Sequence, residues 1–229
     1  LHAAVLTSFP PGVLHTEGGG RVLWRLDRPN DNRRASRSAG TDVSPGLCLY
    51  ISSPAAPDPA GLVEQAGYET EGGVVVKKLD DFLAKLEENQ VWGFRITVNP
   101  TYRHTDNDGR KRLLGHVTVA QQTQWLLDRA EANGFQIPMS AEVGGDLPVL
   151  ENKAGERVDG KNLLVSLVDR RVENFVRVKG EDKRPVTLKL ATFQGTLKVT
   201  DPRALRSALA NGIGRAKGYG AGLLTLARP

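Results

Sequence analysis

Apolar residues in this chain recur in short alternating runs that glycine and proline interrupt, with a few longer runs at helical spacing. Strict alternation predicts half-buried strands, and a period near 3.6 predicts helices. We expect strands at 21–26, 47–52, 91–98, 163–168, 172–179, 186–199 and 223–226, and an extended stretch at 74–77. We expect helices at 1–9, 61–66, 79–88, 117–133 and 202–210.

Two helices carry clear end signals. Val119, Leu126 and Ala130 recur at helical spacing, and Gly134 supplies a C-terminal stop. Asp201 followed by Pro202 is typical of an N-cap and a first helical position. Polar stretches at 28–41, 102–109 and 144–162 are predicted to be loops, with Arg110, Lys111 and Arg112 at the far edge of the second.

The order of these elements predicts an α+β fold of two tandem ferredoxin-like units, with helices on one face of antiparallel sheets. We place the units at 1–90 and 91–229. The first unit is short of one element, because it opens on a helix where a complete unit opens on a strand. Either the fold is incomplete there or its first strand precedes Leu1.

Composition narrows the class of protein only moderately. The net charge of +5 is compatible with a nucleic-acid partner. The single cysteine, Cys48, excludes a disulfide framework and a zinc finger, and its apolar run predicts a buried side chain. No apolar run is long enough to span a membrane and no signal peptide is visible, so we expect a cytoplasmic protein without a membrane partner.

A glycine-rich segment just before the last strand is the strongest chemical signal. It holds Gly212, Gly214, Gly218, Gly220 and Gly222, with Arg215 and Lys217 between them. Backbone N–H groups can approach a ligand closely at glycine, and the two cations suit a polyanion. The segment is not a Walker A motif, and its helix–loop–strand order is the reverse of a dinucleotide fingerprint. Alternatively, it is a turn that only lets the last strand dock.

A predicted hairpin carries basic residues near its tip, at Arg177, Lys179, Lys183 and Arg184. These residues, like Lys111 and Arg112, either solubilise a surface or contact RNA phosphates. Since Arg177 and Lys179 stand at i and i+2 of one strand, their side chains are expected on one face. We favour phosphate contacts for these two and leave Lys183 and Arg184 open.

Several blocks of the chain together resemble the CasE family, the repeat-cleaving endoribonuclease subunits of CRISPR Cascade complexes. Order and spacing of the blocks agree as well as content. The blocks are Leu1-His2 with Phe9-Pro10, GRVLWRL at 20–26, WGFRITVNP at 92–100, Lys111-Arg112 with AQQTQWL at 120–126, FQGTLKVTDP at 193–202, and the glycine-rich segment through Leu224.

The resemblance implies RNA binding by the basic hairpin, by Lys111 and Arg112, and by the glycine-rich segment. It also implies metal-independent cleavage without a cofactor, through attack of a 2′-hydroxyl that leaves a 2′,3′-cyclic phosphate. The implied partners are CRISPR repeat RNA, whose 3′ hairpin stays bound, and the other Cascade subunits. The alternatives are a non-catalytic RNA-hairpin-binding subunit and, more remotely, a mononucleotide-binding enzyme.

Four histidines compete for the acid–base role that this chemistry needs near neutral pH. His2 occupies the family position and is our candidate. We expect His15 to be solvated, His104 to lie in a loop near RNA, and His116 to make a structural hydrogen bond. Some family members carry a lysine five residues after the histidine, where this chain has Thr7, so the charge partner of His2 must come from elsewhere or be weaker. The tyrosine expected three residues before His2 would precede Leu1.

The other aromatic residues have separate expected roles. Tyr219 either stacks on a base or packs under the loop, and the tryptophans Trp24, Trp92 and Trp125 are expected in the core.

Overall fold

A computed structural model describes residues 1–10, 20–28, 47–66, 73–139, 163–179 and 182–229. The predicted loop at 144–162, His15 and all of the predicted loop at 28–41 except Arg28 lie outside the described residues. Within the described residues no helix is long and apolar enough to cross a membrane.

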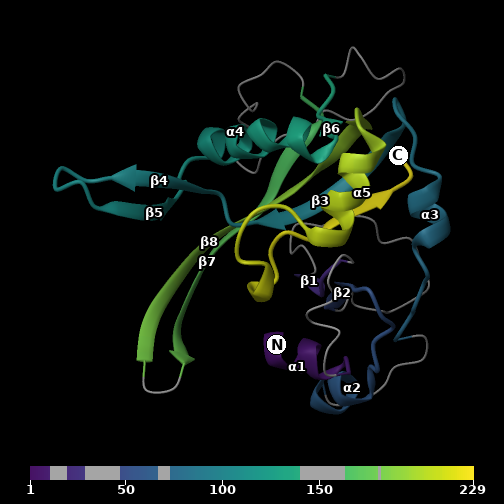
Figure 1. Ribbon diagram of the computed structural model, residues 1–229, viewed down its shortest axis with the longest axis horizontal. Coiled ribbons are helices and arrows are strands. Elements are labelled where there is room, and N and C mark those ends of the chain that lie inside the picture. Colours follow the sequence, from purple (N-terminus) through teal and green to yellow (C-terminus); the bar gives the residue numbers. More distant parts are fainter. Residues whose placement is uncertain (11–19, 29–46, 67–72, 140–162, 180–181) are drawn as a thin grey trace, which may run out of the picture.

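The larger part of the fold is an antiparallel sheet covered by two helices (Figure 1). Its strands are β3 (Val91–Val98), β6 (Phe135–Gln136), β7 (Val165–Lys179), β8 (Asp182–Val199) and β9 (Leu224–Ala227). They run in the order β9–β3–β8, and both β6 and β7 pair with β8. Helices α4 (Val119–Ala130) and α5 (Pro202–Asn211) follow β3 and β8 in the chain. This arrangement is a split β-α-β unit, so the predicted α+β class with antiparallel sheets is confirmed.

The core of this unit lies between the sheet and the helices. Phe94 and Ile96 of β3, Phe193 and Leu197 of β8, and Leu126 of α4 are all buried there. Alternation along the strands puts these side chains on one face, while the helices contribute residues at helical spacing. The helix ends agree with the sequence. The Asp201 carboxylate accepts from the backbone N–H of Arg203 and Ala204, and Gly134 adopts a left-handed φ of 77° after the 3-10 turn η2 (Glu131–Asn133).

A smaller part contains α1 (His2–Thr7), β1 (Leu23–Asp27), β2 (Cys48–Ser52) and α2 (Ala60–Ala66). β1 and β2 pair antiparallel, and Val5, Phe9 and Trp24 form its buried core. Helix α3 (Asp80–Ala84), which falls in the first predicted unit, packs against the core of the larger sheet through Phe82 and Leu83. The boundary near residue 90 stays a prediction.

Two predictions about local secondary structure are wrong. Residues 102–109 and the basic cluster after them are not a loop but most of a hairpin, β4 (Thr101–Thr105) paired with β5 (Lys111–Gly115). Both strands are largely exposed, so no alternating apolar residues marked them. The strands predicted at 163–168 and 172–179 are one strand, β7, with a register shift between Leu167 and Asp169.

Cys48, predicted to be buried, is exposed. Its neighbours Leu49 and Ile51 pack against the Trp24 core, and alternation along β2 therefore turns Cys48 to the opposite face. The tryptophan prediction is confirmed for Trp24 and Trp125, which are buried, and Trp92 packs half-buried against the larger core.

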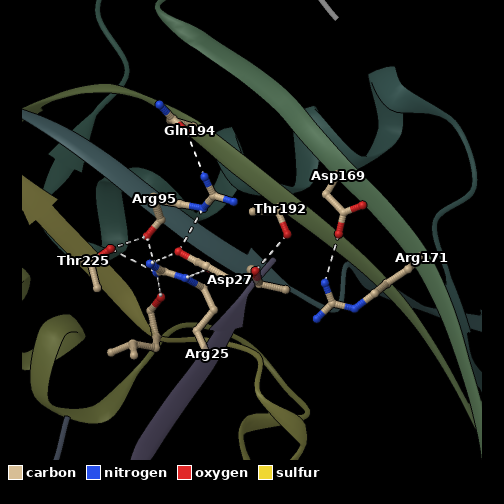
Figure 2. A network of polar contacts seen from close by, with 10 residues as sticks. Arg25, Asp27, Arg95, Asp169, Arg171, Thr192, Gln194 and Thr225 are labelled. Carbon is tan, nitrogen blue, oxygen red and sulfur yellow. Dashed lines mark hydrogen bonds and ion pairs between the residues drawn. The ribbon is translucent and has the colours of Figure 1, made fainter. Parts of the chain in front are cut away.

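A buried arginine joins the two parts of the fold (Figure 2). Arg25 of β1 pairs with Asp27 through Nε at 2.7 Å and Nη2 at 3.1 Å. Its Nη1 donates to the backbone oxygens of Arg95 and Leu223 and to the Thr225 hydroxyl. Arg95 of β3 also reaches Asp27, at 3.3 Å. β1 is thereby attached to β3 and β9 by one guanidinium, each of whose three nitrogens donates to a protein acceptor.

Candidate functional site

The glycine-rich segment forms a closed loop at the edge of the sheet. Ile213 donates its N–H to the Gly222 oxygen at 2.9 Å, and Gly222 donates to the Thr97 oxygen of β3 at 2.7 Å. Ile213 and Ala221 are buried at its two ends. These contacts fix the ends of the loop and leave residues 214–220, including the short turn η3 (Lys217–Tyr219), as its rim.

The first part of the rim resembles an anion-binding backbone. The N–H groups of residues 214–218 donate to no acceptor within the described residues. Arg215 is exposed beside them. Ala216 is held at a φ of 64°, an unusual conformation for a residue with a side chain, while its carbonyl accepts from Tyr219 and Ala221. Successive free N–H groups and a cation are what a phosphate-binding backbone offers. The role of the loop in RNA binding stays a prediction.

His2 lies against the second part of the rim. A Cβ at Gly218 would stand 3.3 Å from the His2 ring, so any side chain there would crowd the imidazole. The His2 and Tyr219 ring centroids are 6.3 Å apart. Tyr219 in turn lies 4.8 Å from Phe175 of β7. Tyr219 therefore packs between the histidine and the long hairpin, which favours the packing alternative over base stacking.

Gly220 brings the same loop against the smaller part of the fold. It adopts a φ of 80°, and a Cβ there would meet the Trp24 ring at 2.5 Å. Glycine is thus required both by the backbone conformation and by the close approach to β1. The loop is held against the part of the chain that carries His2.

Burial and a nearby cation act on His2. Burial, and after it the charge of Arg21, lowers the pKa of His2. Burial and Arg21 also lower the pKa of Lys217. Arg21 therefore acts on His2 electrostatically, and Lys217 precedes Gly218, which lies against the His2 ring. Thr7, which stands where some family members carry a lysine, donates its hydroxyl to the Ala4 oxygen of the same helix at 2.9 Å. Arg21 and Lys217 are the candidates for the charge partner that the sequence left unidentified.

The long hairpin β7–β8 extends from the sheet beside this loop (Figure 1). Arg177 pairs directly with Arg184, and both lie on the face of the hairpin that carries Phe175 and Val186. That face packs on the loop through Phe175, Val186 and Tyr219. Lys183 stands one position before Arg184 and therefore points to the opposite face. Lys179 belongs to β7, but its side chain lies outside the described residues.

The other predicted site residues are not beside His2. Lys111 and Arg112 lie on the β4–β5 hairpin, where Arg112 pairs with Asp106 at 3.5 Å. His104 is exposed opposite Arg112 on β4, not in a loop. His116 follows β5, and its Nδ1 is buried without a hydrogen-bond partner within the described residues, so the predicted structural hydrogen bond of its side chain is not seen.

Sequence reasoning did not find Arg21. It precedes a strand and carries no spacing signal toward His2, since the two meet only in the fold. Among the described residues, no group of three or more His, Cys, Asp or Glu side chains is arranged to hold a metal ion.

Comparison with known proteins places the chain in a family. Residues 1–228 match the family described as CRISPR associated protein. The CRISPR-associated endoribonuclease Cse3 of Thermus thermophilus is 27% identical over 212 residues, covering 92% of this chain and 82% of its own length.

Solved structures agree in fold. Thermus thermophilus Cse3 bound to an RNA representing a pre-cleavage complex has a TM-score of 0.64 at 23% identity, covering 99% of this chain and 86% of that one. A chain of a CRISPR RNA-guided surveillance complex, pre-nicking, has a TM-score of 0.60 at 23% identity, covering 100% and 88%. These likenesses support the tandem ferredoxin-like class.

Proposed function

Because the chain belongs to the CasE family of CRISPR-associated proteins, we propose that it is an endoribonuclease that cleaves CRISPR repeat hairpins in precursor guide RNA. The observation that carries the proposal is the position of His2, an acid–base group set against a glycine-rich loop in a cationic neighbourhood. The related Cse3 of Thermus thermophilus is an endoribonuclease.

The chemistry we propose needs no group beyond this chain and the RNA. The 2′-oxygen upstream of the break forms a bond to phosphorus, and the bond from phosphorus to the 5′-oxygen breaks. A 2′,3′-cyclic phosphate and a 5′-hydroxyl result. His2 takes the proton of the 2′-hydroxyl, and the imidazolium so formed returns a proton to the departing 5′-oxygen. Its lowered pKa keeps the imidazole neutral near pH 7, which suits the role of base.

The cations around His2 serve the transition state. Negative charge builds on the phosphate oxygens as the new bond forms, and positively charged donors fixed in advance stabilise it. Arg21, which acts on His2, and Lys217, which Arg21 also influences, are our candidates. The free N–H groups of residues 214–218 can hold the neighbouring phosphate in place.

We expect cleavage to continue in EDTA and to stop when the nucleotide before the break carries 2′-deoxyribose, because the nucleophile is then missing. The deoxy RNA should still bind. The measurement is product formation on a denaturing gel, with a phosphatase assay for the cyclic phosphate. Metal-dependent cutting of the deoxy RNA would contradict the mechanism, and binding without cutting of the ribose RNA would favour a non-catalytic subunit.

The partners we propose are the 3′ hairpin of the processed guide RNA and the protein subunits of a Cascade complex. The support is a structural relative that belongs to a CRISPR RNA-guided surveillance complex. The paired arginines Arg177 and Arg184 give the hairpin a cationic face continuous with the His2 site. A-form RNA is recognised mainly through its backbone, which such a face suits.

The two faces of the β7–β8 hairpin allow a matched test. Arg177→Ala and Arg184→Ala should each weaken RNA binding and reduce the log–log salt slope by up to roughly one unit for each phosphate that is no longer neutralised. Lys183→Ala removes the same charge from the opposite face and should leave the slope unchanged. The measurement is a binding titration at several salt concentrations. If the salt slopes of all three variants equal that of the wild type, the charges of the hairpin serve only solvation.

A further inference from the structure

The glycine-rich loop also lines a cavity. The cavity, of about 510 Å³, lies between the β4–β5 hairpin, α4 and the loop. Tyr102 and Arg103 come from β4, Trp125 and Arg129 from α4, and Gly214 and Arg215 from the loop. Nothing in the proposed cleavage step uses these side chains.

Aromatic rings form one wall of this cavity. The Tyr102 and His116 centroids lie 4.8 Å apart with the planes inclined by 34°. Tyr102 is 41% exposed, so part of its ring remains uncovered. An exposed aromatic ring already supported by a second ring is a platform on which a nucleobase can stack.

Two ring nitrogens near this wall lack partners. His116 Nδ1 and Trp125 Nε1 are both buried without a hydrogen bond to any described residue. Buried polar atoms normally have partners, and both nitrogens belong to residues that line the cavity, although neither atom is itself exposed to it.

The charge of the cavity favours an anion. Arg103, Arg129 and Arg215 line it against a single carboxylate, Asp128, so three positive charges and one negative give a net +2. Arg129 lies 4.0 Å over the Trp125 ring, and its Nη1 donates to the Trp125 oxygen at 3.1 Å, which fixes its position. Arg215 is exposed at the loop and adds a solvent-facing cation. Rings and arginines together suit a nucleotide better than an apolar peptide.

We propose that this cavity binds one unpaired nucleotide of the RNA next to the repeat hairpin, with its base on Tyr102 and its phosphate near Arg103 or Arg215. The inference rests on the proposed function. Gly214 at the cavity and Gly218 at His2 are four residues apart, so their backbones are at most about 14 Å from each other. The same loop can therefore hold the strand on both sides, and the cavity would fix which phosphate reaches His2.

The test compares three RNAs made from the repeat of the source genome, each with 2′-deoxyribose before the break. One is trimmed to the paired stem, one carries unpaired 5′ nucleotides and one unpaired 3′ nucleotides. Wild-type protein should bind one extended RNA about tenfold more tightly than the trimmed stem, as one stacked base allows. Tyr102→Ala should abolish that gain and leave the affinity for the trimmed stem unchanged.

Matched variants distinguish the loss of base stacking from general damage to the protein. Tyr102→Phe keeps the ring and should keep the gain, while Arg215→Gln should reduce it. Arg203→Gln removes an exposed arginine of α5 that does not line the cavity and should change nothing. A photoreactive uridine at the bound position should crosslink to the peptide that contains Tyr102 or His116.

Equal affinity of wild type for all three RNAs, or an unchanged gain in Tyr102→Ala, would overturn the proposal. So would a variant that binds every RNA normally but no longer co-purifies with the other subunits, because the cavity would then dock a protein. Failure of the proposed function looks different, since the wild type would then cleave no repeat RNA at all.

Discussion

Replacing His2 with alanine should reduce cleavage of repeat RNA by about 10²- to 10⁴-fold, the usual contribution of a general acid or base. RNA affinity should change little, because the phosphate-binding groups lie on the loop and the hairpin. His2 also stands at the start of a short helix, outside the buried core of the smaller part, so its replacement leaves the core packing intact. The measurement is the single-turnover rate with protein in excess, alongside a binding titration.

Two comparisons make this result specific to His2. His104→Ala alters an exposed histidine of β4 and should leave the rate within about twofold of wild type, since surface changes of this kind have small effects. In wild type the rate should fall as the pH drops through the pKa of His2, at a pH below the ordinary histidine value, because burial and the charge of Arg21 lower that pKa. A His2→Ala variant that cuts at a comparable rate would assign the chemistry to another residue.

The loop that faces His2 illustrates what sequence can predict. Helix α5 begins at Asp201 and the final strand begins after Gly222, and both limits follow from local rules of capping and glycine conformation. The sequence left two roles for the loop, a polyanion site and a turn that only lets the last strand dock, because residue content alone does not show which N–H groups are free. The structure adds that those of residues 214–218 have no acceptor among the described residues.

The missed features are those that depend on contacts between distant segments or on exposed strands. Arg21 acts on His2 across an interval of the chain that no periodicity spans. The β4–β5 hairpin buries little apolar surface, so its strands lack the alternation that marks β3 and β8. Tyr102 and His116 were assigned to separate local features for the same reason, although they form one wall of a cavity.

The buried cluster around Arg25 should be the largest single contributor to stability outside the apolar core. Arg25→Met leaves the hydrophobic packing nearly intact but removes the donors to Asp27 and to the oxygens of Arg95 and Leu223. Removing one partner of a buried ion pair leaves the other charge buried without a partner, which costs about 3–5 kcal/mol of stability. Arg95 remains 3.3 Å from Asp27 and offsets part of this loss.

Arg171→Met is the matched control, because Arg171 also pairs with two carboxylates, Asp169 at 2.9 Å and Glu173 at 3.1 Å. Its side chain is 22% exposed against 2% for Arg25, so water stabilises the charges that remain, and we expect a loss of about 1 kcal/mol or less. Arg25→Lys should resemble Arg25→Met, since a single ammonium cannot replace the planar fork of donors. The measurement is the free energy of unfolding in urea.

Loss of Arg25 should also lower activity at the cleavage site. β1 carries both Arg25 and Trp24, and Trp24 meets the glycine-rich loop at Gly220. Loosening β1 from β3 and β9 therefore shifts the part of the fold that holds His2 relative to the loop that holds the phosphate. At a temperature where Arg25→Met is fully folded by circular dichroism, its cleavage rate should fall while the affinity for the trimmed stem is retained, because the β7–β8 hairpin is unaffected. Wild-type stability and rate in this variant would show that the two parts are held together by the apolar contacts alone.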